Sequence, residues 1–335
     1  MRKLSLLFFM LFGVVYAQSA EEFFSRGLAK ANKKDYTGAI ADYTKAIAID
    51  PNMNAAYFNR GIAKDELKDH VGAIADYTKA ISINPYNPSY FFNRGLAKAE
   101  LKDYKGAIED YTKAIDINSN NASFYYRRGM AKYFLKENYS AIEDYTKAIA
   151  IDPGKIQFYN ARGFVKNLTK DYNGAIEDYT KAITINPSQP TPYYNRGIAK
   201  RNLEDYTGTI EDCTKAIVIN PNEKDYYNER GYSKLVLKDY AGAIADYTKA
   251  IAINPNEKYY YSQRAFAKTR LNDYAGAISD YTEAIAIDPN RAEYYLNRGA
   301  CQLGVNNKSL GCDDLRRALE LGESRANDLI KKYCQ

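Results

Sequence analysis

Two columns of opposite charge recur along the chain with a period of 34 residues. Each arginine of one column is followed 16 residues later by an aspartate of the other. A guanidinium can form two parallel hydrogen bonds with a carboxylate, so the columns could pair, or the arginines could form a track for anions. Because every arginine has a matched aspartate, we predict a structural ion-pair ladder. Its members are Arg26, Arg60, Arg94, Arg128, Arg162, Arg196, Arg230, Arg264 and Arg298 with Asp42, Asp76, Asp110, Asp144, Asp178, Asp212, Asp246, Asp280 and Asp314.

Residue types that carry out catalysis are scarce outside these columns. His70 is the only histidine, and the chain has no glycine-rich phosphate loop, no HExxH motif and no GxSxG motif. A catalytic centre needs a unique arrangement of side chains with perturbed neighbours, whereas these acidic residues recur in nine similar settings. We therefore expect no catalytic residue, no cofactor and no metal site, and the pattern argues against an enzyme.

The elements that must position the ladder are visible in the repeat itself. "DYTKAI" recurs verbatim six times, and the rows contain no insertion. In each row an apolar stripe at helical spacing is followed by a break such as "KDHVG", whose aspartate suits a helix N-cap, and then by a second stripe. The rows are 20–53, 54–87, 88–121, 122–155, 156–189, 190–223, 224–257, 258–291 and a degenerate 292–325. Each row predicts a hairpin of two helices, and glycines such as Gly61, opposite Ala73, predict close approach of the two backbones. A period of this size predicts a solenoid.

This pattern resembles the tetratricopeptide repeat, a 34-residue helix–turn–helix unit with the pattern W-x2-L-G-x2-Y, A-x3-F, P. Row 54–87 reads Tyr57-x2-Arg60-Gly61-x2-Lys64, then Ala73-x3-Tyr77, then Pro85. The resemblance covers residues 20–325 and implies an all-α, right-handed superhelical solenoid of antiparallel helix hairpins. The row departs from the family pattern where tyrosine, arginine and lysine replace its Trp, Leu and Tyr, which changes the surface chemistry more than the fold.

The first seventeen residues differ in kind from the rest. "MRK" precedes the apolar "LSLLFFMLFGVV", and Val15-Tyr16-Ala17 ends the segment. This is the layout of a secretory signal peptide, residues 1–17, with a mature chain of residues 18–335. About twelve apolar residues fall short of the roughly 20 that span a bilayer, so we expect no stable membrane insertion of the mature chain. The protein is predicted to be exported to a periplasmic or extracellular compartment.

Composition and cysteines add two further expectations. The chain of 335 residues is 46% hydrophobic and 26% charged with a net charge of +6, which is globular and too mildly basic to indicate a nucleic-acid partner. Cys213 replaces a packing tyrosine and is expected to be a buried thiol. Cys301, Cys312 and Cys334 lie near a predicted C-terminal cap, residues 323–335. A Cys312–Cys334 disulfide would fix the terminal helix.

The resemblance also implies where a partner would bind. In the family, the first helices of the hairpins line a concave groove that takes extended peptides or partner helices. The variable position after the first conserved aromatic is aromatic in the first four rows and mostly polar later. The predicted peptide-binding residues, chiefly within 20–135, are Phe24, Phe58, Asn59, Phe92, Asn93, Tyr126, Arg127 and Tyr194. An alternative is that these rings only pack against neighbouring helices.

The function predicted from these features is that of an exported scaffold that binds an unidentified protein or peptide. A carbohydrate-binding or envelope-assembly module with the same fold stays open as the alternative, because exposed tyrosine and asparagine also suit sugars.

Overall fold

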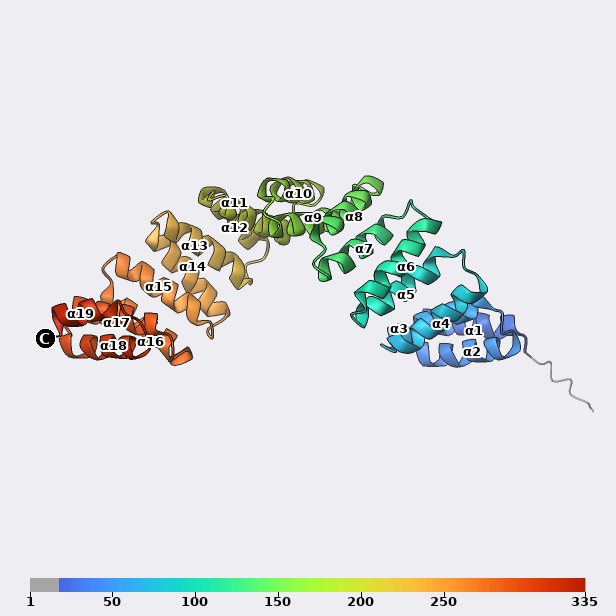
Figure 1. Cartoon of the computed structure of the whole chain (residues 1–335), viewed down its shortest axis with the longest axis horizontal. Helices are drawn as coiled ribbons and strands as arrows, with labels where there is room; N and C mark the ends of the chain where they lie inside the picture. The colour runs from blue at the N-terminus through green and yellow to red at the C-terminus, as the bar shows by residue number, and fades with distance from the viewer. Residues whose placement is uncertain (1–17, 335) are drawn as a thin grey trace, which may run out of the picture. The chain divides into compact units, whose positions relative to one another are not determined.

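The computed structural model describes residues 18–334, so the predicted signal peptide, 1–17, lies outside the described part of the chain. Every element in this part is a helix, and successive helices pair as antiparallel hairpins (Figure 1). The prediction of an all-α solenoid of helix hairpins is confirmed. No helix within residues 18–334 combines the length and the apolar character that a membrane span needs.

The chain divides into two compact units, the first ending at Pro153 and the second beginning at Gly154. The first unit contains four hairpins: α1 (Ala20–Asn32) with α2 (Tyr36–Ile49), α3 (Asn54–Glu66) with α4 (His70–Ile83), α5 (Pro88–Glu100) with α6 (Tyr104–Ile117), and α7 (Ala122–Phe134) with α8 (Asn138–Ile151).

The second unit contains five hairpins and one further helix. They are α9 (Ile156–Leu168) with α10 (Tyr172–Ile185), α11 (Pro190–Asn202) with α12 (Tyr206–Ile219), α13 (Lys224–Val236) with α14 (Tyr240–Ile253), α15 (Lys258–Arg270) with α16 (Tyr274–Ile287), α17 (Ala292–Gly304) with α18 (Lys308–Glu320), and lastly α19 (Ala326–Tyr333).

The turn inside each hairpin has a local cause. In most rows an aspartate caps the second helix, as where Asp69 accepts a hydrogen bond from the backbone N–H of Gly72 at 2.9 Å. The carboxylate thereby satisfies one of the donors that a helix N-terminus leaves free. The residue before the cap adopts a left-handed conformation, for example Lys68 with φ 68°. This reversal brings the two helices of the hairpin side by side.

A buried tyrosine fills the centre of most hairpins. The ring of Tyr77 on α4 is fully buried and lies against Gly61 on α3, where an added Cβ would come within 2.6 Å of the ring. We expected Gly61 to serve close approach of its backbone to the backbone around Ala73. The close approach is seen at the same position of row 122–155, where a Cβ on Gly129 would lie 3.3 Å from the backbone oxygen of Ala141, and the glycine in addition makes room for the tyrosine ring.

Successive hairpins within a unit share their cores, as a solenoid requires. Tyr43 of the first row packs in one cluster with Ala63 of the second, and Tyr247 packs with Ala267 of the row that follows it. At the C-terminal end Leu329 and Ile330 of α19 cover the cluster around Leu315. The terminal helix therefore covers the apolar face of the hairpin formed by α17 and α18.

Candidate functional site

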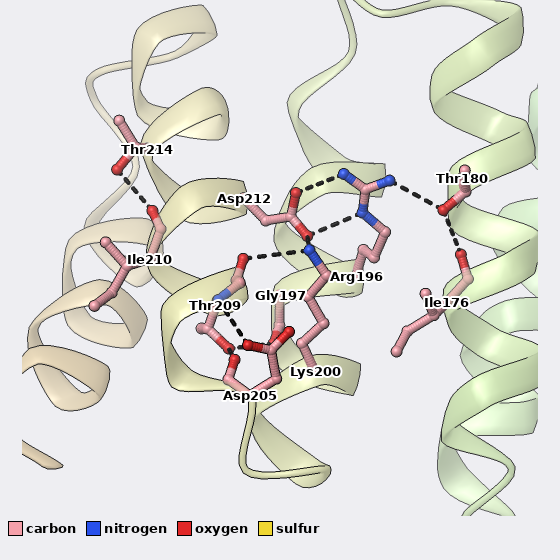
Figure 2. Close-up of polar contacts among 11 residues, drawn as sticks. Ile176, Thr180, Arg196, Gly197, Lys200, Asp205, Thr209, Ile210, Asp212 and Thr214 are labelled. Atoms are coloured by element: carbon pink, nitrogen blue, oxygen red, sulfur yellow. Dashed lines mark hydrogen bonds and ion pairs between the residues drawn. The ribbon is translucent and has the colours of Figure 1, made fainter. Parts of the chain in front are cut away.

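The ion-pair ladder is formed by bidentate pairs between the two helices of each hairpin. In row 190–223 the Nε of Arg196 donates to Oδ2 of Asp212 at 2.9 Å, and Nη2 donates to Oδ1 at 2.6 Å (Figure 2). The same two contacts recur in all nine rows, from Arg26–Asp42 to Arg298–Asp314. Each aspartate is buried, so its charge depends on these partners.

A lysine completes each rung in the first eight rows, and sequence reasoning missed this role. Lys200 places Nζ 2.9 Å from Oδ2 of Asp212 and also donates to the carbonyl oxygen of Gly208 at 3.4 Å (Figure 2). In the first row, the hydrogen bond from Arg26, with help from Lys30, lowers the pKa of Asp42 to about 2. The sequence contained the information needed to predict this lysine contact, because each lysine follows its arginine by four residues and lies on the same helix face. The lysines are Lys30, Lys64, Lys98, Lys132, Lys166, Lys200, Lys234 and Lys268.

Threonines at the third position of the "DYTKAI" motif and its variants join seven of the nine rungs to the preceding hairpin. Nη1 of Arg196 donates to Oγ1 of Thr180 at 3.0 Å, and Thr180 in turn donates to the carbonyl oxygen of Ile176 (Figure 2). The guanidinium therefore donates hydrogen bonds both within its own hairpin and to the preceding hairpin. This arrangement favours a structural ladder over an anion track.

The predicted groove aromatics lie in the packing between helices. Phe58 is half-buried, with its ring centroid 5.8 Å from that of Tyr77 and 4.7 Å from that of Tyr90 in the next row. The remaining rings of the set make comparable contacts: Phe24 with Tyr43, Phe92 with Tyr111 and Phe124, Tyr126 with Tyr145, and Tyr194 with Tyr226. None of them is an exposed ring, and the contacts they make are packing contacts with other aromatic rings.

The polar members of the predicted set divide into two kinds. Asn59 and Asn93 donate to the carbonyl oxygens of Ala55 and Ser89 in their own helices, each at 2.8 Å. Their amides are thus already engaged. Arg127 is exposed and lies beside Tyr126, with its guanidinium carbon 6.0 Å from the ring centroid. Of the polar residues predicted to bind a peptide, Arg127 is the one that is exposed.

A cavity of about 340 Å³ opens between α5 and α7 in the first unit. Tyr111 forms its floor, Leu96 and Met130 line its walls, and Arg127 lies at its edge. Phe134, 51% exposed, also lines it. Three charged side chains, Glu100, Lys102 and Arg127, also line it. A concave surface with an apolar lining and a few charged groups is the usual composition of a site that holds a ligand side chain.

The cysteines and the histidine are placed as follows. Cys312 and Cys334 form a disulfide that ties α18 to the end of α19, while Cys213 and Cys301 are buried free thiols. His70 contacts Asp65 through Nδ1 at 2.6 Å. Within residues 18–334, no group of three or more His, Cys, Asp or Glu side chains is arranged to hold a metal ion.

Family comparison identifies the repeat. Models described as "TPR repeat" match residues 27–67, 96–135, 169–203 and 267–304, and models described as "Tetratricopeptide repeat" match 55–87, 122–155 and 225–257. Together these matches cover more than half of the chain, which belongs to the tetratricopeptide repeat family. Membership of this family favours a protein-interaction scaffold over a catalyst.

Solved structures show the same fold. The C-terminal part of a TPR repeat-containing protein from Cytophaga hutchinsonii matches with a TM-score of 0.64 at 20% identity, over 72% of this chain and 98% of that one. A tetratricopeptide repeat protein from Parabacteroides merdae matches with a TM-score of 0.55 at 20% identity, over 75% and 99% of the two chains. YrrB, a TPR protein with an unusual peptide-binding site, matches with a TM-score of 0.53 at 20% identity, over 57% and 99%. No curated protein matches the sequence.

Proposed function

We propose that the protein is an exported scaffold that binds an extended peptide segment of a partner protein in the groove between α5 and α7. The observation that carries this proposal is the cavity of about 340 Å³ between these first helices, which Phe134 lines with a half-exposed ring. Large apolar side chains that remain exposed around a concave surface commonly mark binding sites.

The lining of this cavity indicates the chemistry of the peptide. Leu96 and Met130 offer an apolar wall, and methionine adapts its shape to the side chain it contacts. The ring of Phe134 is stacked on Tyr104, with centroids 4.9 Å apart, which holds it in place before a ligand arrives. Its two cations, Arg127 and Lys102, outnumber its one anion, Glu100, so the lining favours a carboxylate. The expected ligand is therefore a segment with one large apolar side chain next to an acidic residue.

Export is supported by two independent features. Residues 1–17 have the charge and apolar pattern of a secretory signal peptide. The disulfide between Cys312 and Cys334 is of a kind that persists in oxidising compartments. Residues 1–17 fused to a reporter enzyme that is active only after export should give reporter activity. A fusion that stays inactive would contradict the export proposal.

Selection from a random peptide library displayed on phage would test the groove. The bait is residues 18–335, and the matched variants are Met130→Glu/Phe134→Glu in the cavity and Val71→Glu on the exposed face of α4, where Val71 is 68% exposed. We expect the unmodified bait and the Val71 variant to select peptides with an apolar residue beside Asp or Glu. The cavity variant should bind those peptides at least about tenfold more weakly, which corresponds to about 1.4 kcal/mol.

Two outcomes would overturn the groove proposal. One is that no peptide is enriched above background with the unmodified bait. The other is that enriched peptides bind the cavity variant with the affinity they have for the Val71 variant. Thermal unfolding of all three proteins, run first, separates loss of binding from loss of folding.

A further inference from the structure

A second cavity, of about 300 Å³, lies in the other unit between α15 and α17. It has the same floor as the first, since Tyr281 occupies the row position of Tyr111. Its walls are different in kind. Both cavities have charged side chains in their lining, but amide and hydroxyl groups stand in this one where the first has leucine and methionine.

Two amides in this cavity are available to a ligand. Gln263 on α15 and Asn297 on α17 line it from the same position in successive rows, and neither is hydrogen-bonded within residues 18–334. The asparagines at that position in earlier rows, Asn59 and Asn93, instead donate to their own helices. Each free amide offers both donors and acceptors. The two amides can therefore bind groups that both donate and accept.

The charged residues at this cavity indicate a neutral ligand. Arg291 and Glu293 line it together, with Nη2 of the arginine 3.7 Å from Oε2 of the glutamate. A ligand carboxylate would be repelled by Glu293, and a ligand ammonium would be repelled by Arg291. Two neighbouring hydroxyl groups of a neutral ligand suit the Arg291–Glu293 ion pair, because one hydroxyl can donate to the carboxylate while the other accepts from the guanidinium.

Two partly exposed aromatic rings complete the cavity. Tyr259 is 37% exposed and Phe266 is 45% exposed, and both line it from α15. An aromatic face carries partial negative charge and packs against C–H groups of partial positive charge. Vicinal hydroxyls on one edge and a face of C–H groups on the other are the two recognition features of a pyranose ring.

We propose that the cavity between α15 and α17 is a binding site for a neutral saccharide of one or two pyranose rings. Its free amides and the Arg291–Glu293 pair hydrogen-bond the hydroxyls, while Tyr259 and Phe266 pack against the ring. This site is separate from the peptide groove between α5 and α7 and stands on different residues. An exported protein would meet such ligands on glycans of the cell surface or its surroundings.

The test uses residues 18–335 and a panel of neutral methyl glycosides, comprising hexosides and N-acetylhexosaminides, followed by saturation-transfer NMR and calorimetric titration. We expect at least one glycoside to bind. Gln263→Leu/Asn297→Leu should weaken it by at least about tenfold, the effect of losing one or two net hydrogen bonds. Asn59→Leu is the matched control, because that amide lies in the same column but is bonded to its own helix, and it should leave the affinity unchanged.

A second variant distinguishes loss of binding from loss of folding. Phe266→Ser alters a half-exposed ring and should also weaken the glycoside by at least about tenfold while the thermal midpoint stays near that of the unmodified protein. Absence of binding across the panel, or equal affinity in the Gln263/Asn297 and Phe266 variants, would overturn the proposal. Peptide binding and its loss in the Met130/Phe134 variant are read separately, so failure of either proposal leaves the other standing.

Discussion

Nε of Arg201 lies 2.5 Å from Oε1 of Glu229, so an ion pair joins α11 to α13 at the point where row 190–223 lacks its core tyrosine. Cys213 stands in place of that tyrosine. In rows 88–121 and 122–155 the corresponding positions, Ala99 and Arg127, lie around the ring of Tyr111. Burial, and then the charge of Glu229, raises the pKa of the Cys213 thiol. The ion pair thus lies in the part of the solenoid where cysteine replaces the core tyrosine.

The two members of this pair should respond unequally to truncation. Burial raises the pKa of Glu229 and Arg201 opposes the rise, while the side chain of Arg201 is 33% exposed and that of Glu229 only 10%. Arg201→Ala would leave a buried carboxylate without its partner and should cost about 3 kcal/mol in the free energy of unfolding. Glu229→Ala leaves an arginine that can reach water, and should cost no more than about 1 kcal/mol. Urea unfolding at pH 7 measures both.

The pH dependence of the Arg201→Ala variant provides an independent check. A carboxyl group whose folded pKa is raised above its unfolded value stabilises the fold below the unfolded pKa, and that contribution is lost as the pH rises. Without Arg201 the pKa of Glu229 rises further, so the variant should regain stability as the pH is lowered from 8 to 5. Equal costs for the two truncations, with no recovery in acid, would contradict this account of the pair.

The ladder shows how far the sequence could predict the fold and where it could not. The Arg–Asp pairs could be predicted because both residues recur at a fixed offset and belong to the same hairpin, which brings them together. The bond from Arg196 to Thr180 joins two hairpins, and its partner depends on how the hairpins stack, which periodicity does not determine. The burial of Phe58 has the same origin, since Tyr90 of the next row covers it. One exposed residue of the candidate site, Arg127, was therefore predicted, whereas the apolar lining of the cavity was not.

Asp42 should make the first row sensitive to strong acid. The hydrogen bond from Arg26 lowers the folded pKa of Asp42 to about 2, against an ordinary value of about 3.9 for an unfolded chain. A depressed carboxyl pKa contributes stability above the unfolded value, and this contribution is lost as the pH falls from about 4 through 2. Carbonyl NMR should show Asp42 titrating below pH 3. The Arg26→Ala variant is the control, and a titration of Asp42 at the same pH in both proteins would refute the prediction.

Two glycines at the same row position should respond oppositely to alanine. A Cβ on Gly61 would lie 2.6 Å from the Tyr77 ring, whereas a Cβ on Gly197 would lie 3.4 Å from Sγ of Cys213. Gly61→Ala should destabilise the protein by about 1–3 kcal/mol through overpacking. Ala265 stands at this position beside buried Tyr281, so a ring can shift to accept a methyl group and the lower end of the range is expected.

Gly197→Ala is the matched case without a ring. It should leave stability unchanged or raise it by up to about 1 kcal/mol, since alanine favours helix more than glycine does. Thermal and urea unfolding of the two variants side by side would decide the matter. A greater loss for Gly197→Ala than for Gly61→Ala would mean that the tyrosine is not what requires glycine at this position.

The Cys312–Cys334 disulfide should hold the terminal helix against the last hairpin. The helix α19 has only eight residues, too few for independent stability, and it covers the apolar cluster around Leu315 through Leu329 and Ile330. The bond closes a loop with a sequence separation of 22, for which a cross-link contributes about 3 kcal/mol. Reduction, or Cys334→Ser, should accelerate amide hydrogen exchange in α19 while the exchange of α11–α14 stays unchanged. Cys301→Ser, which removes a free thiol, should leave α19 protected. If α19 kept its protection after reduction, apolar contact with Leu315 alone would be sufficient to cap the solenoid.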